Sequence, residues 1–170
     1  MKYIFIIVCL LAGGSSIAQI QSVSLQAGGL TCSMCSRAIY KSLQKVPDVA
    51  SVQEDIEHSS YHIQFSDPSK TSLENLQRAV RDAGFSVVRM EIKANFKNAE
   101  VASDSTLKLN DMTVKFVGIR QQRLNGVIRL LILDRDYLLE KDRKKYAGSF
   151  EYVPASGGDA PVFHVTLPQS

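Results

Sequence analysis

Residues 23–35 read VSLQAGGLTCSMC and carry the change from a predicted strand to a predicted helix. Apolar residues alternate with polar ones at the start of this stretch, as on a half-buried strand. After the second cysteine, apolar residues recur every three or four positions, as on one side of a helix, at Ile39, Leu43 and Val46.

The pattern continues in the same manner up to residue 93. A hairpin is predicted around the polar turn 57–60, a second helix after the turn 67–71, and a last strand over 88–92. Gly84 is expected to end the second helix. The fold class predicted is α+β, with a ferredoxin-like βαββαβ domain over residues 22–93 followed by a small mostly-β domain.

Cys32 and Cys35 place two thiols where this strand ends and this helix begins. Two cysteines separated by two residues can direct both sulfurs toward one point. The second lies in the first helical turn, where unpaired N–H groups and the positive end of the helix dipole favour thiolate over thiol. Thiolates are soft ligands, so the pair predicts a metal site for Cu(I), with Hg(II), Zn(II) or Cd(II) as competitors.

The N-terminus has the pattern of a secretory signal peptide. Lys2 precedes an unbroken apolar run over residues 3–12, which is about half of the roughly 20 residues that a membrane-spanning helix needs. We expect residues 1–18 to be removed, together with Cys9. The mature chain would then be exported, periplasmic or secreted, without an integral membrane segment, and would keep one close cysteine pair in place of a disulfide framework.

Four short stretches carry a resemblance to a known family: GLTCSMC at 29–35, Ala38-Ile39, VPDV at 46–49 and DAGF at 82–85. Through them, residues 22–93 resemble a heavy-metal-associated domain, the module of copper chaperones and of the N-terminal tails of copper-transporting P-type ATPases. The resemblance implies that the two motif cysteines bind the ion and that the aromatic ring of Phe85 shields it.

The residue before the first cysteine bears on the choice of metal. Relatives that handle Zn(II), Cd(II) or Pb(II) often have an aspartate there, whereas this chain has Thr31. Two thiolates alone suit Cu(I), because zinc prefers four donors. We therefore expect a carrier or buffer of Cu(I) that gives up its ion by thiolate exchange to a metal-transporting membrane protein or another metal-accepting protein.

Several nearby residues are expected to stay outside the site. Glu54 stands where the family has an apolar residue, which predicts a frayed or solvent-facing stretch of the second strand. Met34 is expected to point outward. His58 and His62 belong to a hairpin and are explained by turn polarity and strand alternation. Arg37 is expected to be an ordinary solvated helix residue.

Two alternatives to a copper carrier stay open. Hg(II) also accepts two sulfurs, and small exported mercury-scavenging proteins share this fold. A Cys-x-x-Cys pair at a helix start is also typical of thiol–disulfide redox proteins. Against redox chemistry, the chain contains no tryptophan and the residues between the cysteines, Ser33 and Met34, differ from those of redox loops.

The remaining residues are predicted to form a linker, 94–105, and a mostly-β domain, 106–170, of unknown role. A hairpin around Asn110-Asp111, a central strand over 127–133, a helix over 136–146 and closing strands near 150–152 and 163–167 are expected. This half contains no recognisable catalytic motif, so we do not expect an enzyme. A net charge of +3 gives no basis for nucleic-acid binding. Five basic residues are expected on a solvated strand face rather than at an anion site: Lys115, Arg120, Arg123, Arg129 and Arg135.

Overall fold

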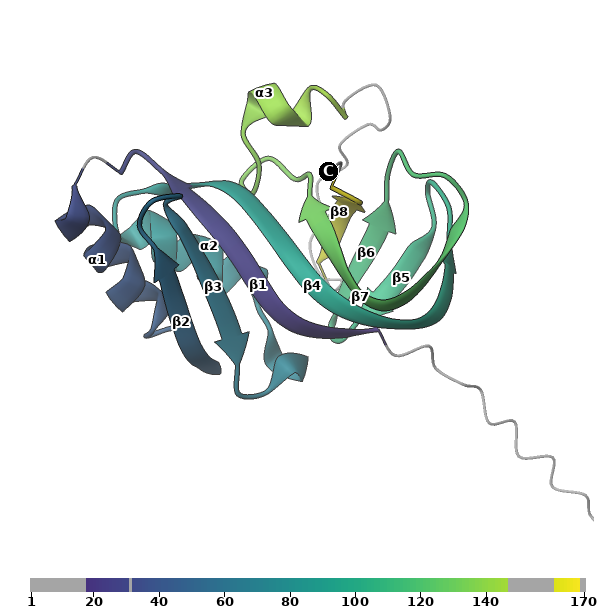
Figure 1. Ribbon diagram of the computed structural model, residues 1–170, viewed down its shortest axis with the longest axis horizontal. Helices are drawn as coiled ribbons and strands as arrows, with labels where there is room; N and C mark the ends of the chain where they lie inside the picture. The colour runs from purple at the N-terminus through teal and green to yellow at the C-terminus, as the bar shows by residue number, and fades with distance from the viewer. Residues whose placement is uncertain (1–17, 31, 147–160, 169–170) are drawn as a thin grey trace, which may run out of the picture.

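The computed structural model describes residues 18–30, 32–146 and 161–168 (Figure 1). Its elements in chain order are β1 (Gln19–Gly28), α1 (Ser33–Leu43), β2 (Val49–Asp55), β3 (Ser60–Phe65), the 3-10 helix η1 (Pro68–Lys70), α2 (Leu73–Asp82), β4 (Ser86–Val101), β5 (Thr106–Leu109), β6 (Met112–Phe116), β7 (Gln122–Ile132), α3 (Glu140–Arg143) and β8 (Val162–Thr166). The predicted signal peptide, apart from Ala18, and the predicted strand near 150–152 lie outside the described residues.

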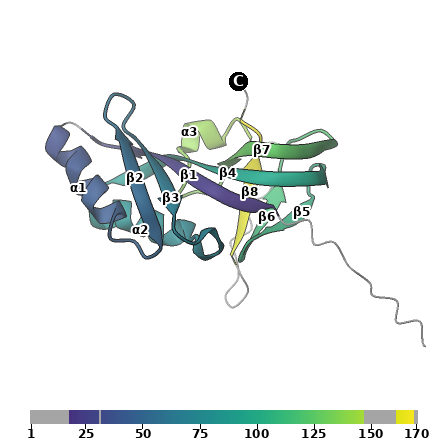
Figure 2. The same cartoon turned by 60° about the horizontal axis from the view of Figure 1, so that its bottom comes forward.

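The N-terminal half has the predicted α+β, ferredoxin-like arrangement. Its strands lie in the order β2-β3-β1-β4, and each neighbouring pair is antiparallel. Helices α1 and α2 cover the same face of this sheet, as Figures 1 and 2 show. The predicted apolar stripe is confirmed for Ile39 and Leu43, which α1 buries in the core. Val46 is buried as well, but it lies in the turn after the helix.

Both ends of α2 are capped, and the predicted termination at Gly84 is confirmed. The Ser72 hydroxyl accepts a hydrogen bond from the Asn75 N–H at 3.2 Å, which satisfies one of the free donors of the first turn. At the other end, Gly84 has φ +90° and the Phe85 N–H reaches back to the Val80 carbonyl at 3.1 Å. This glycine termination turns the chain directly into β4 and so fixes the position of Phe85.

The predicted linker is wrong for residues 94–101, which continue β4. This strand of 16 residues pairs with β1 over residues 86–95 and with β7 over residues 91–101, so that residues 91–95 lie between the two. The alternation is interrupted at a bulge, where the register with β7 shifts between Phe96 and Ala99 and Asn98 has φ +51°. A bulge bends a strand without ending it, so the loss of a clean two-residue period in the sequence does not mark a loop here.

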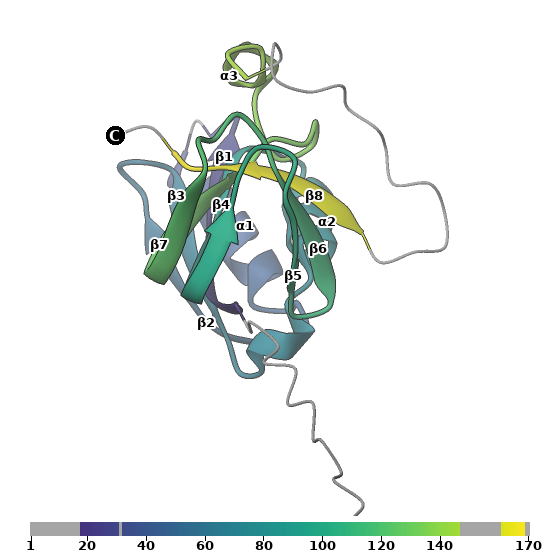
Figure 3. The same ribbon diagram turned by 90° about the vertical axis from the view of Figure 1, so that its right-hand side faces the viewer.

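The C-terminal half extends the same sheet, whose full order is β2-β3-β1-β4-β7-β8-β6-β5. Figure 3 shows β7, β8, β6 and β5 curling round beside β4, and an isolated bridge between Ala18 and Leu109 brings β5 back to the start of β1. One hydrophobic cluster runs from Leu25 and Ile39 in the first half to Phe116 and Val165 in the second. A separately packed second domain is therefore not confirmed.

Other expectations for this half have mixed outcomes. The predicted hairpin is β5–β6, and the predicted central strand over 127–133 coincides with the second half of β7, which begins five residues earlier and ends at Ile132. The predicted helix over 136–146 is wrong in extent, because the α-helix comprises only Glu140–Arg143. The residues before it are held by contacts with the sheet, including a backbone hydrogen bond from the Leu139 N–H to the Val88 carbonyl at 3.0 Å. None of the helices in the described ranges is both long and apolar enough to cross a membrane.

Candidate metal site at the start of helix α1

Two glycines at the end of β1 shape the turn that carries the cysteines. A Cβ atom on Gly28 would lie 2.4 Å from Cγ1 of Val88, so the close contact between β1 and β4 leaves no room for a side chain there. Gly29 has φ +83°, a conformation that L-residues rarely adopt. These two positions let the chain leave the sheet and enter α1 only a few residues later.

Cys32 is the N-cap of α1. Its backbone is extended, with φ −152° and ψ 155°, and its Sγ accepts a hydrogen bond from the Cys35 N–H at 3.3 Å. The sulfur therefore takes the place of the usual capping oxygen and lies over the first helical turn. Negative charge on a thiolate–metal complex at this position would be favoured by the unpaired N–H groups and the helix dipole.

Both cysteines are within reach of a ligand. Cys32 is exposed, Cys35 is half-buried, and both are present as thiols. They occupy the N-cap and N3 positions of a single helical turn, so their side chains rise from the same end of α1. Within the described parts of the chain, no third histidine, cysteine or acidic residue joins them in a metal-binding cluster.

A buried tyrosine of the sheet holds the first turn of α1 in place. Tyr61, on β3, is fully buried, and its hydroxyl donates a hydrogen bond to the Ser36 carbonyl at 3.2 Å. Burial raises the pKa of the Tyr61 hydroxyl, which keeps it a donor. At the other end of the helix, the Ser42 hydroxyl donates to the Ala79 carbonyl of α2 at 2.7 Å. The helix that carries the cysteines is thus fixed to both the sheet and its neighbouring helix.

Phe85 lies next to the cysteine turn, as the resemblance implies. The position of a Cβ on Gly29 is 3.9 Å from Cδ1 of Phe85, and the ring is half-buried against the core. Phe85 lines a shallow groove together with Gly29, Gly84 and Leu139. Leu139 belongs to the C-terminal half, is 39% exposed, and has no local sequence signal that would place it here.

The structure gives the surroundings of the residues that we expected to stay outside the site. Met34 is 82% exposed. His58 pairs with Asp55, with Nδ1 2.9 Å from Oδ2, and its backbone and side-chain hydrogen bonds lower the pKa of that carboxyl. The Nδ1 of His62 lies 2.8 Å from the Ser24 hydroxyl. The guanidinium of the exposed Arg37 lies 5.4 Å from the centre of the Tyr40 ring, a cation–π contact.

Glu54 differs from its prediction. It lies within β2, directly opposite Tyr61, and is half-buried instead of frayed or solvent-facing. Its Oε1 atom is buried and has no hydrogen-bond partner among the described residues. A buried carboxylate oxygen without a partner costs free energy, so this residue weakens the fold where the family has an apolar side chain.

Replacement of Glu54 by methionine is expected to stabilise the protein. The change keeps the length of the side chain and removes the unpaired oxygen, which should raise the free energy of unfolding by about 1 kcal/mol. Urea denaturation followed by circular dichroism measures the change. Glu57→Met, in the exposed turn of the same hairpin, is the matched control and should have little effect. A loss of stability in Glu54→Met would show that this carboxylate is satisfied in solution.

Comparison with known proteins finds relatives of the N-terminal half. A family model described as "Heavy-metal-associated domain" matches residues 24–86. A mercuric transport protein periplasmic component from Serratia marcescens is 37% identical over 68 residues, which cover 40% of this chain and 74% of that protein. Copper-transporting ATPase 1 from Mus musculus is 33% identical over 73 residues, or 43% of this chain and 5% of the ATPase. Oxidized MerP from Ralstonia metallidurans is a similar solved structure, at 37% identity, 40% coverage of this chain, 96% coverage of MerP and a TM-score of 0.37.

Proposed function

Since this chain belongs to the heavy-metal-associated domain family through residues 24–86, we propose that it binds a soft metal ion between Cys32 and Cys35 and passes that ion to another protein. The single observation that carries this proposal is the first turn of α1, which presents an exposed and a half-buried thiol at its N-terminal end. Phe85, beside Gly29, would cover one side of the ion.

Transfer would proceed by ligand exchange. An ion held by two sulfurs keeps an open side, and the exposure of Cys32 allows a thiolate of a second protein to approach it. The incoming thiolate forms a three-coordinate intermediate, after which one of the original sulfurs leaves. The ion thus moves between proteins without being released into water, so transfer is fast although binding is tight.

Cu(I) is the ion that we assign first. It is monovalent and thiophilic and is satisfied by two thiolates, whereas zinc prefers four donors. Similarity to copper-transporting ATPase 1 agrees with this choice. Hg(II) is the second candidate, because the relative from Serratia marcescens is named a mercuric transport protein and Hg(II) also accepts two sulfurs.

We further propose that the protein is exported and acts as a carrier or buffer rather than as an enzyme. The predicted signal peptide supports export, and the name of the relative from Serratia marcescens places that protein in the periplasm. The recipient would be a metal-transporting membrane protein or another protein with a reactive thiolate pair.

Parallel titrations with the two candidate ions test which of them the protein binds. The full chain, fully reduced, is titrated with Cu(I) in the presence of a coloured Cu(I) chelator, and in parallel with Hg(II) in the presence of a competing monothiol. We expect one Cu(I) per chain to be withdrawn from the chelator. Binding of Hg(II) with no competition for Cu(I) would replace the first assignment by the second. If neither ion were bound, the proposed function would be wrong.

A further inference from the structure

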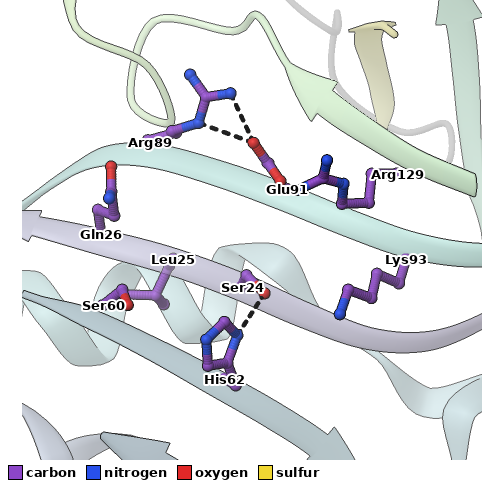
Figure 4. A pocket seen from close by; sticks show the side chains of 9 residues that line it. All are labelled: Ser24, Leu25, Gln26, Ser60, His62, Arg89, Glu91, Lys93 and Arg129. Atoms are coloured by element: carbon purple, nitrogen blue, oxygen red, sulfur yellow. Dashed lines mark hydrogen bonds and ion pairs between the residues drawn. The ribbon is translucent and has the colours of Figure 1, made fainter. Parts of the chain in front are cut away.

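A cleft on the helix-free face of the sheet lies away from the cysteine turn and has a different chemistry. It crosses β3, β1, β4 and β7 and has a volume of about 170 Å³ (Figure 4). Its charged and hydrogen-bonding groups include Ser24, His62, Arg89, Glu91, Lys93 and Arg129. We call this set the cationic cleft. With three basic residues and one acidic residue, its formal charge is +2 when His62 is neutral.

The charges of the cationic cleft are only partly compensated. Arg89 binds Glu91, with Nε and a terminal nitrogen 2.8 Å and 2.6 Å from the same carboxylate oxygen. Lys93 and Arg129 are direct cross-strand partners of β4 and β7. Like charges in directly opposite positions destabilise a sheet, and in the described ranges neither residue has an ion-pair partner.

The other basic residues of the C-terminal half provide a contrast. Lys115 lies 3.1 Å from an Asp104 oxygen, and Arg123 is paired with Glu100 at 2.5 Å. These residues fit the predicted solvated strand face. Arg129 is also exposed on its strand, but it differs from them in facing Lys93 across the ladder and lining a cleft. The sequence could not distinguish it, since the register of β7 against β4 brings these two residues together.

The remaining groups of the cationic cleft can form hydrogen bonds with the oxygen atoms of a ligand. The Ser24 hydroxyl and the His62 Nδ1 lie 2.8 Å apart across β1 and β3. In Figure 4, Lys93 extends over β1 toward this pair, whereas Arg129 extends beside Glu91. An ammonium, a guanidinium, a hydroxyl and an imidazole thus border one small space. Guanidinium and ammonium groups bind phosphate-type oxygens through charge-assisted hydrogen bonds.

We propose that the cationic cleft binds a phosphate-type oxyanion between Lys93 and Arg129. The anion would offset the repulsion between these two side chains, and the volume of about 170 Å³ accommodates such a group. The C-terminal half contributes Arg129 to the cleft through the pairing of β7 with β4, so the proposal also gives this half a role. It does not depend on metal binding by Cys32 and Cys35.

The test uses the full chain and two double variants with the same change of charge. Lys93→Gln with Arg129→Gln removes the two central cations. Lys97→Gln with Arg123→Gln removes an exposed lysine and an exposed arginine from the same two strands, outside the cationic cleft. Inorganic phosphate is titrated at low ionic strength, because exposed charges are screened by salt, and binding is followed by NMR shifts of the His62 ring and of backbone amides in β4 and β7.

We expect saturable binding that weakens at least about tenfold in the first double variant, or 1.4 kcal/mol, and less than about twofold in the second. Vesicles of phosphatidylglycerol, compared with phosphatidylcholine, identify the source of the anion: tighter binding through the same two residues would assign the oxyanion to a lipid headgroup. Equal weakening in both double variants, or no saturable shift with either probe, would overturn the proposal. Unchanged Cu(I) uptake by the first double variant would show that the two sites are separate.

Discussion

Replacement of Cys32 and Cys35 by serine is expected to abolish competition for Cu(I) with a chelator. Four-ligand zinc sites in small domains contribute about 10–16 kcal/mol, or roughly 3 kcal/mol for each ligand. Each single cysteine variant should therefore bind Cu(I) about a hundredfold more weakly or worse. The fold should survive, because Cys32 is exposed and Cys35 is only half-buried, and the N-cap hydrogen bond can be accepted by a serine oxygen.

Met34→Ser is the matched control for these variants. It makes a similar change between the two cysteines, at a side chain that is 82% exposed, and should leave Cu(I) affinity unchanged. A large loss in Met34→Ser would mean that its thioether is a third ligand. If the double serine variant kept full Cu(I) affinity and the circular dichroism spectrum of the parent, the metal would bind elsewhere. That result would contradict the proposed function.

Replacement of Asp134 by alanine is expected to cause the largest loss of stability. Asp134 and His164 are both buried, and their carboxylate and imidazole lie 2.9 Å apart. The other carboxylate oxygen accepts a hydrogen bond from the backbone N–H of His164 at 2.8 Å. The change removes both interactions in a buried setting, which should lower the free energy of unfolding by about 2–4 kcal/mol. Urea denaturation followed by circular dichroism measures it.

Glu100→Ala provides the control for Asp134→Ala. Glu100 also pairs with a cation, Arg123, but its side chain is 65% exposed, so its loss should cost less than about 1 kcal/mol. Because β4 and the hydrophobic cluster are shared by the two halves, we expect Asp134→Ala to lower the unfolding midpoint of the whole chain in one transition. Two separated transitions, with the N-terminal half unchanged, would show that the halves fold independently.

The placement of the two cysteines could be predicted because its determinants are local. The N-cap position, the two glycines and the following helix all lie within residues 28–43, and hydrogen bonds within one turn position Cys32 and Cys35. Phe85 was placed correctly through the family resemblance, and the structure adds the glycine termination that holds it. Leu139 was missed because its place beside Phe85 depends on contacts with β4, far away in sequence.

The sequence by itself determined the βαββαβ half, the helix caps and the position of the two thiols, because each of these depends on a period or a hydrogen bond spanning a few residues. Only the tertiary structure decided that β4 runs on through the predicted linker, that one core unites both halves, and that Lys93 faces Arg129. These features depend on strand register between distant segments, and a register shift of one residue would place other side chains together.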